Sequence, residues 1–321
     1  MRLIADIGAT NARFALLDED GTIREPHTLP VAAFPTPAEA VRRYLSERGA
    51  VVREAALAVA APVDEDPVRF LNSPWILRRR ELQEALGLSR LLLLNDLQAQ
   101  ALAVAALQRE DLPKIGGGPP LRERPAVVIG PGTGLGTAAL VPCEDAVHAV
   151  ATEAGHMALA AETAEERRLL ALLAERFGHV SRERVLSGPG LVHLAHAQWR
   201  LAGRDPGQAP GRPAEVVERA RRHGCPLCQQ ALRHFSALLG AYAGDLALAY
   251  GALGGVFLVG ALLGRLGDGF DCALFRRRFE AKGRLGPYLA RIPVYRVEAP
   301  DLGLRGAALA LAGGAGKALA G

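Results

Sequence analysis

Cysteine is scarce in this chain. Four cysteines are spread irregularly over 321 residues, which is too few for a disulfide framework in a chain of this length. Cys225 and Cys228 form a Cys-x-x-Cys pair, but a four-ligand zinc site needs a second pair, and the sequence offers only His223 and the distant Cys272. We therefore expect a reducing, cytoplasmic location and interpret the pair as structural or incidental.

Aromatic residues and lysine are also sparse. Aromatic residues make up 5% of the chain, which leaves few platforms on which nucleic-acid bases could stack. The net charge is only +4, and the basic residues are nearly all arginines, in pairs such as 221–222 and runs such as 276–278. A solvated helix face is the usual explanation of such groups, so no nucleic-acid partner is expected.

Neither a targeting segment nor a membrane span is expected. Only Leu3, Ile4 and Ala5 precede the charged Asp6, so the apolar core of a signal peptide is absent. Residues 246–264 carry no charge and are long enough to span a bilayer, but five glycines divide them into a helix end, turns and a short strand. We expect a buried strand there and no membrane partner.

The composition and length are those of two globular domains. Half of the residues are hydrophobic and 22% are charged, which excludes disorder, and the length is about twice that of a typical domain. Residues 3–21 have the order strand, small-residue turn, strand and acidic turn, and residues 126–146 repeat that order. The chain therefore looks duplicated, with residues 113–125 as the expected linker.

Strands alternate with helices after each repeat, which indicates an α/β fold. Thr36, Pro37 and Glu39 supply an N-cap, a proline at the first helical position and a capping-box acid, so a helix begins there. Further strands are expected at residues 28–32, 56–61, 91–94, 256–259 and 294–297. Further helices are expected at residues 77–86, 164–176, 190–201, 213–221, 225–250, 271–280 and 303–312, and one more follows residues 95–96 and ends at residue 107.

Two glycine-containing corners between strands predict phosphate binding. The corner with Asp6, Gly8 and Thr10 lets backbone N–H groups approach a phosphate, with a hydroxyl to donate and an acid to hold a metal or its water. The corner at residues 130–136 is richer in glycine, and two such corners in equivalent halves of the chain can bind one polyphosphate. For the first corner alone, the alternative is a plain hairpin turn with a surface acid. The second corner does not fit a dinucleotide fingerprint, and the tail at 313–317 is followed by Ala318 instead of the Ser or Thr of a Walker A loop.

Asn95 and Asp96 follow a short apolar strand. Ligands of open α/β sheets bind beyond the carboxyl ends of strands, so a carboxylate at residue 96 is suited to accept a proton from a substrate hydroxyl during phosphoryl transfer. The alternative from the residues alone is that Asp96 caps the following helix, where aspartate is favoured.

At these motifs the chain resembles the bacterial glucokinases of the hexokinase, actin and Hsp70-like ATPase fold. The resemblance is carried by ADIGATNARFAL, NSPW (residues 72–75), LLNDLQA, GPGTGLG, EAGH (153–156), SRERVLSGPG (181–190) and GGVFLVG (254–260), in this order along the chain. It implies transfer of the γ-phosphoryl group of ATP to the 6-hydroxyl of glucose, with Mg²⁺, by a cytoplasmic enzyme that we expect to be a homodimer.

The resemblance also implies residue roles. Asp96 matches the general base, and the residues that match the sugar-holding set are Asn95, Asp96, Glu153, His156 and Glu183. The positions that match the nucleotide site are Ala5, Asp6, Ile7, Gly8, Ala9, Thr10, Gly132, Thr133 and Gly260, with Asp6 as a candidate for holding Mg²⁺ through water. The family often has glycine where this chain has Ala5, Ala9, Ala154 and Ala261, and a positive φ at any of them would cost energy.

The implied fold is a two-domain actin-like ATPase (ribonuclease H-like) fold, with duplicated mixed β-sheet domains around a central cleft. We expect a small domain of residues 1–107 plus 298–321 and a large domain of residues 108–297. The alternative enzyme is a kinase of another hexose or an aminosugar with the same mechanism. A non-catalytic sugar-binding regulator is a further alternative, but it would need a DNA-binding helix pair, and no room for one is expected before residue 6. An actin-like filament-forming protein would keep the nucleotide corners but would not need the sugar-binding residues.

Overall fold

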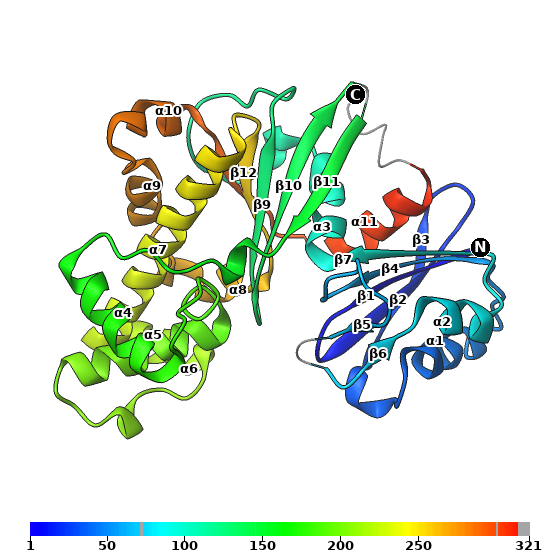
Figure 1. The fold of residues 1–321 in the computed structure, drawn as a ribbon, viewed down its shortest axis with the longest axis horizontal. Coiled ribbons are helices and arrows are strands. Elements are labelled where there is room, and N and C mark those ends of the chain that lie inside the picture. Colours follow the sequence, from blue (N-terminus) through cyan, green and yellow to red (C-terminus); the bar gives the residue numbers. More distant parts are fainter. Residues whose placement is uncertain (71–72, 145, 300, 314–321) are drawn as a thin grey trace. The chain divides into compact units, whose positions relative to one another are not determined.

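The computed structural model describes residues 1–70, 73–144, 146–299 and 301–313 (Figure 1). Internal contacts divide the chain into two compact units. Unit 1 comprises residues 1–107, residues 138–151 and the chain from residue 301 on, and unit 2 comprises residues 108–137 and 152–300. Residues 138–151, expected in the large domain, group with unit 1 in this division, and the boundaries expected from the sequence stay a prediction.

The first sheet has five strands in the order β3-β2-β1-β4-β7. The predicted hairpin is formed by β1 (Arg2–Ile7) and β2 (Asn11–Leu17), and β3 (Ile23–Pro30) continues it antiparallel. On the other side β4 (Glu54–Val59) and β7 (Arg90–Asn95) run parallel to β1. The strand expected at residues 28–32 overlaps only the end of β3, because this edge strand has almost no buried side chains to set up an alternation.

Two pairs of helices pack on the two faces of this sheet. Leu3, Ala5 and Ile7 of β1 share a core with α1 (Pro37–Ser46) and α2 (Arg79–Leu86). Ile4 shares a second core with α3 (Asp96–Ala105) and α11 (Leu302–Leu311). Because side chains alternate along a strand, Asp6 belongs to the face covered by α3 and α11. A small unpredicted sheet of β5 (Val68–Arg69) and β6 (Ile76–Leu77) completes this part of the chain.

The second sheet has six strands in the order β11-β10-β9-β12-β13-β8. Its strands are β8 (Lys114–Gly116), β9 (Ala126–Pro131), β10 (Leu135–Cys143), β11 (Ala146–Thr152), β12 (Gly255–Leu258) and β13 (Val294–Arg296). In this sheet β9 occupies the position that β1 occupies in the first sheet. β12 pairs parallel with β9 and with β13, as β4 pairs parallel with β1 and with β7 in the first sheet. The linker expected at residues 113–125 contains β8, which the sequence did not indicate because a strand of three residues that ends in glycine is too short to show an alternating pattern.

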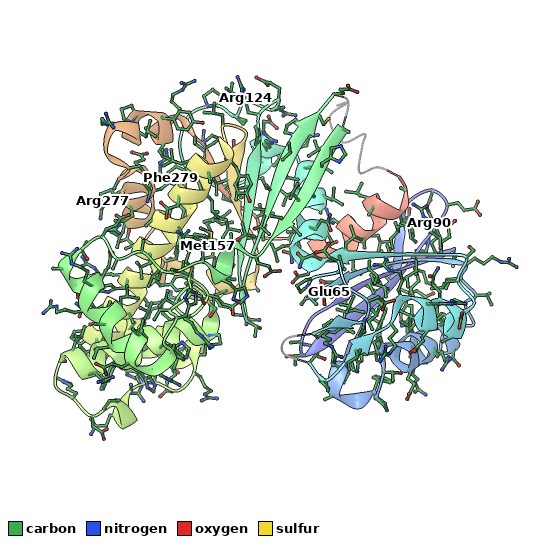
Figure 2. The ribbon with its side chains drawn as sticks, viewed as in Figure 1. Glu65, Arg90, Arg124, Met157, Arg277 and Phe279 are labelled. Atoms are coloured by element: carbon green, nitrogen blue, oxygen red, sulfur yellow. The ribbon has the colours of Figure 1, made fainter. Side chains whose placement is uncertain are left out.

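Helices make up most of the remainder of unit 2. They are α4 (Ala164–Phe177), α5 (Gly188–Leu201), α6 (Pro213–Arg221), α7 (Pro226–Tyr250), α8 (Ala261–Leu266), α9 (Cys272–Glu280) and α10 (Gly286–Arg291). Phe279 of α9 packs closely on α7, where a Cβ on Gly244 would lie only 2.5 Å from the Phe279 carbonyl oxygen (Figure 2).

The uncharged stretch 246–264 contains the end of α7, β12 and the beginning of α8. As expected, its middle part is a strand, and all four residues of β12 are buried. Of the helices in the described ranges, none combines the length and the hydropathy that crossing a membrane requires.

Candidate active site

The carboxyl ends of β1, β4 and β7 lie at one edge of the first sheet. Ile7 is in register with Val59, and Val59 is in register with Asn95. With neighbouring strands about 4.8 Å apart, Ile7 and Asn95 are about 10 Å apart across the sheet. The Nδ2 group of Asn95 also donates to the Ala61 carbonyl at 3.4 Å. Unit 1 therefore brings the first glycine corner and the Asn95-Asp96 pair to the same sheet edge.

The first corner is tight and accessible. The Gly8 N–H donates to the Asn11 carbonyl at 2.9 Å, and the Thr10 carbonyl accepts from the Val31 N–H at 2.9 Å. Thr10 is exposed and Gly8 is partly exposed, so the hydroxyl and the backbone of this turn are open to a ligand. In contrast, Ala5 and Ile7 are fully buried in the core, and any contribution from them to ligand binding is by backbone groups.

The start of α3 places the Asn95-Asp96 pair. Asn95 is the N-cap, and its Oδ1 accepts from the N–H groups of Leu97 at 3.0 Å and Gln98 at 3.3 Å. Asp96 is the first helical residue, and its Oδ1 accepts from the Leu97 N–H at 2.8 Å. The cap position therefore belongs to Asn95 rather than to Asp96, a role that the preference for Asn at N-caps could have suggested.

Asp6 lies opposite Arg13 of β2 in the strand register. Burial raises the pKa of Asp6, and the Arg13 charge opposes that rise. A Cβ on Gly303 of α11 would lie 2.5 Å from Oδ2 of Asp6, so glycine at residue 303 makes room for this carboxylate. Sequence reasoning missed Gly303, although a glycine in the first turn of a helix is a signal of close approach.

One carboxylate of this kind fits Mg²⁺, which proteins usually hold through one or two carboxylates together with substrate phosphates and waters. Within the described ranges no three His, Cys, Asp or Glu residues are grouped as a metal site would require. Asp6 would accordingly hold Mg²⁺ only together with a nucleotide, and Cys225 and Cys228 lack the further ligands of a zinc site. All four cysteines are free thiols.

Three of the sequence motifs meet at Leu135 in unit 2. The Leu135 N–H donates to Oε2 of Glu183 at 2.9 Å, and the Glu183 N–H donates to the Gly155 carbonyl at 2.9 Å. A Cβ on Gly155 would lie 2.1 Å from the Leu135 carbonyl oxygen, so only glycine permits this approach. Glu153 and His156 flank Gly155 in the same turn, with Nε2 of His156 3.7 Å from Oε2 of Glu153. The predicted residues Glu153, His156 and Glu183 are therefore close together in the fold.

The second glycine corner is fixed by its neighbours. The Gly132 N–H donates to the Gly134 carbonyl, and the Gly188 N–H, at the start of α5, donates to the Gly132 carbonyl, each at 2.8 Å. A Cβ on Gly134 would lie 2.5 Å from Oε2 of Glu183. The corner that is predicted to bind phosphate thus contacts a predicted sugar ligand directly.

A pocket of about 1150 Å³ opens at this corner, lined by Gly132 and Thr133, the start of α5, α6 and α8. This volume exceeds that of most small-molecule sites and is sufficient for a nucleotide. Gly260 precedes α8 with φ +94°, and a Cβ on it would lie 3.1 Å from the Pro131 carbonyl oxygen. The glycine is therefore required for the approach of α8 to β9.

Four arginines and one glutamate line the pocket, namely Arg212, Arg221, Arg222, Arg265 and Glu218. This excess of positive charge suits a polyphosphate. The sequence indicated a solvated helix face at Arg221 and Arg222, and both residues are exposed while they also line this pocket.

The alanines that replace family glycines cause no backbone strain. Among the described residues, the only non-glycine residues with positive φ are Glu25 and Glu144, so Ala5, Ala9 and Ala154 adopt ordinary conformations, and so does Ala261. Asn72 of the NSPW motif and residues 314–321 of the tail lie outside the described residues.

Comparison with known proteins gives a consistent result. The glucokinase family model matches residues 3–313. The glucokinase of Aromatoleum aromaticum is 47% identical, over 97% of this chain and 94% of that protein. The crystal structure of glucokinase from an Antarctic psychrotroph has a TM-score of 0.84 at 36% identity and covers 97% of this chain and 98% of its own.

A more distant structure shows the shared fold alone. A ROK family glucokinase from Streptomyces griseus, in complex with glucose and AMPPNP, has a TM-score of 0.64 at 19% identity and covers 98% of this chain and 99% of its own. Together with the closer structure, it confirms the predicted two-domain α/β fold of the actin-like ATPase type.

Proposed function

This chain belongs to the glucokinase family, and we propose that it transfers the γ-phosphoryl group of ATP to the 6-hydroxyl of glucose, giving glucose 6-phosphate and ADP. It is a glucose kinase by its match over residues 3–313 and its identity to curated glucokinases. The observation that carries the finer assignment is the meeting of the GPGTGLG, EAGH and SRER segments at Leu135. A phosphate-binding corner and candidate sugar ligands contact each other there.

The sugar-binding set in the proposal is Asn95, Asp96, Glu153, His156 and Glu183. Each hydroxyl of a hexose both donates and accepts hydrogen bonds, so a set of carboxylates, an amide and an imidazole suits it. Asp96 is the proposed general base: its carboxylate accepts the proton of the 6-hydroxyl as the new P–O bond forms. Most of the catalysis in phosphoryl transfer comes from positioning and charge neutralisation, so the base contributes only part of the rate.

The nucleotide-binding set in the proposal comprises Ala5, Asp6, Ile7, Gly8, Ala9, Thr10, Gly132, Thr133 and Gly260. The pocket beside Gly132 and Thr133 would take the nucleotide, and its arginines attract the polyphosphate. ATP as the donor is supported by the AMPPNP complex of the structural relative. Asp6 would hold Mg²⁺ through water, and when bound this ion neutralises charge on the phosphate oxygens.

A cytoplasmic location, a role in glycolysis and a homodimeric state belong to the same proposal. They are supported by the resemblance to the family, and the homodimer is tested by light scattering of the purified protein, where the mass of a single chain would contradict it.

A coupled ADP-release assay with a panel of hexoses and aminosugars tests the proposed reaction. We expect the highest kcat/KM with glucose, and no release without sugar or after chelation of Mg²⁺. A higher kcat/KM with another hexose or an acylated aminosugar would favour the alternative enzyme, and sugar-independent ADP release would contradict the proposal.

A further inference from the structure

Arg182 directly precedes Glu183 and is almost completely buried, with 7% of its surface exposed. Its Nη2 group lies 3.1 Å from Oδ2 of Asp245, and its guanidinium lies over the Tyr242 ring, 4.6 Å from the centroid. A buried charge is costly unless it is paired and hydrogen-bonded. These partners on α7 therefore fix the side chain of Arg182 in one place.

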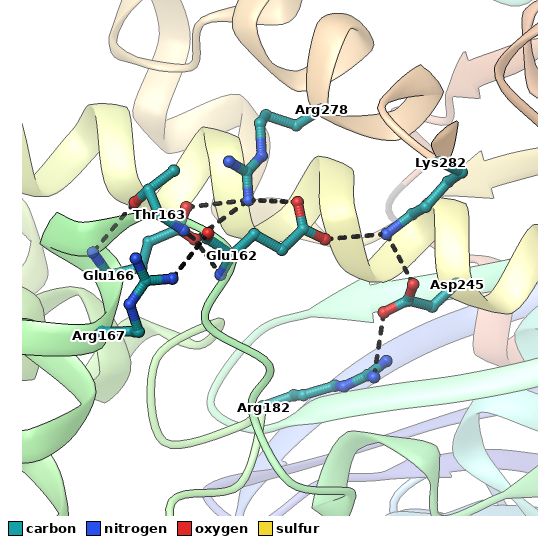
Figure 3. Close-up of polar contacts among 8 residues, drawn as sticks. All are labelled: Glu162, Thr163, Glu166, Arg167, Arg182, Asp245, Arg278 and Lys282. Carbon is teal, nitrogen blue, oxygen red and sulfur yellow. Dashed lines mark hydrogen bonds and ion pairs between the residues drawn. The ribbon is translucent and has the colours of Figure 1, made fainter. Parts of the chain in front are cut away.

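Asp245 is itself held by a chain of alternating charges (Figure 3). Its Oδ1 lies 2.7 Å from Nζ of Lys282. Lys282 also pairs with Glu162 at 3.3 Å, and Glu162 pairs with Arg278 at 3.0 Å. Arg182 is thus one end of an ion network that connects α7, α9 and the segment before α4, and this network anchors the residue next to Glu183.

Arg182 also connects the segment that contains Glu183 to the segment that contains Glu153 and His156. Its N–H donates to the Met157 carbonyl at 3.0 Å, and its Nε donates to the Ala158 carbonyl at 3.4 Å. Because the Glu183 N–H donates to Gly155, contacts from residues 182 and 183 enclose His156 on both sides.

We propose that Arg182 is a positioning residue, which holds Glu183 and the His156 turn in the geometry that binds glucose. The proposal rests on the proposed sugar-binding role of Glu183. The carboxylate of Glu183 has the Leu135 N–H as a partner, but its backbone is located by the neighbouring Arg182 anchor. Because a misplacement of about 1 Å weakens a binding group substantially, loss of the anchor should weaken glucose binding while the nucleotide pocket is spared.

The test is the Arg182→Met variant, alone and combined with Glu183→Gln. Asp245 keeps Lys282 as a partner in Arg182→Met, so no buried carboxylate is left unpaired. We expect the KM for glucose to rise about tenfold, the scale of one weakened charged hydrogen bond, while the KM for ATP stays within about twofold. If Arg182 acts through Glu183, Arg182→Met should raise the KM for glucose by a smaller factor in the Glu183→Gln background than in the wild-type background.

Arg276→Met is the matched control. Arg276 is also a nearly buried arginine of unit 2, which lies over the Phe279 ring at 4.9 Å and pairs with Glu280, but within the described ranges its partners lie outside the proposed sugar-binding segments. Its loss should lower the melting temperature and leave the KM for glucose unchanged. Arg182→Lys, which keeps the charge beside Asp245, should restore part of the glucose affinity. If Arg182→Met does not fold, Asp245→Asn weakens the same anchor and should raise the KM for glucose in the same direction.

The outcomes separate this proposal from the one on which it rests. If Glu183→Gln leaves the KM for glucose unchanged, the sugar-binding role of Glu183 is wrong, and the role of Arg182 falls with it. If Glu183→Gln raises that KM but Arg182→Met only lowers the melting temperature, or raises both KM values equally, Arg182 is merely structural and the positioning proposal alone is overturned.

Discussion

Replacement of Asp96 by asparagine separates chemistry from folding. The side chain keeps its size, and α3 keeps its cap, because Asn95 accepts the N–H groups of Leu97 and Gln98. Loss of the negative charge in the first helical turn costs about 0.3–1 kcal/mol, which corresponds to a fall in Tm of only a few degrees for a chain of this size. Loss of a general base lowers kcat by about 10²–10⁴-fold, or about 3–5 kcal/mol in the activation barrier.

The assay compares kcat from coupled ADP release with the affinities for glucose and ATP from calorimetry. We expect kcat to fall by at least about a hundredfold and both affinities to change by only a few-fold. Asp271→Asn is the control, because Asp271 is also an acid at a helix start, where its Oδ1 accepts from the Leu274 N–H at 2.8 Å, and its loss should leave kcat unchanged. Near-normal turnover of Asp96→Asn would refute the assignment of the base.

Four further substitutions test other parts of the site. Gly134→Ala should raise the KM for glucose about tenfold in steady-state kinetics, because its Cβ would lie 2.5 Å from Oε2 of Glu183; an unchanged KM would contradict that contact. Gly303→Ala should raise the KM for ATP and not that for glucose, because its Cβ would lie 2.5 Å from Oδ2 of Asp6. Asp6→Asn should raise the melting temperature of the nucleotide-free protein at pH 7, because burial raises the pKa of Asp6 and ionisation therefore costs stability. This gain in melting temperature should disappear when the pH falls below 3.8, the ordinary pKa of aspartate, because the carboxyl is then protonated in the folded and unfolded states alike. Val217→Trp should fill part of the pocket and raise only the KM for ATP, and equal affinity in calorimetry would show that the nucleotide binds elsewhere.

Much of the fold could be predicted because many elements carry their own local signals. The Thr36 N-cap accepts the Glu39 N–H as the sequence indicates, and α6 has the predicted bounds. The elements that were missed or shortened lack such signals. β3 is nearly all exposed, and β8 has only three residues and is specified by its pairing with β13. Their strand character depends on partners far away in the sequence.

The candidate site was predictable as a set of residues but not as a geometry. The motifs give Glu153, His156 and Glu183 individually, yet nothing in their spacing shows that their two segments meet the second glycine corner at one residue, Leu135. The sequence also does not show why these glycines are needed. Gly155, for example, must be glycine because the carbonyl oxygen of Leu135, in another segment, lies against it. Close approach of this kind is a tertiary property, and it can be read only from the folded chain.

The proposed sugar ligands and the residues beside them differ in burial, and this difference shows how accessible side chains can be held in place. The side chains of His156 and Glu153 are 45% and 57% exposed, so packing alone does not hold them. Their immediate neighbours are fixed instead: Gly155 lies against a backbone carbonyl, and the residue before Glu183 is buried in an ion network. The accessible residues proposed to bind sugar therefore alternate with buried neighbours along the chain. It follows that substitutions which never touch the substrate should change glucose affinity, whereas equally buried charges elsewhere in the unit should affect only stability.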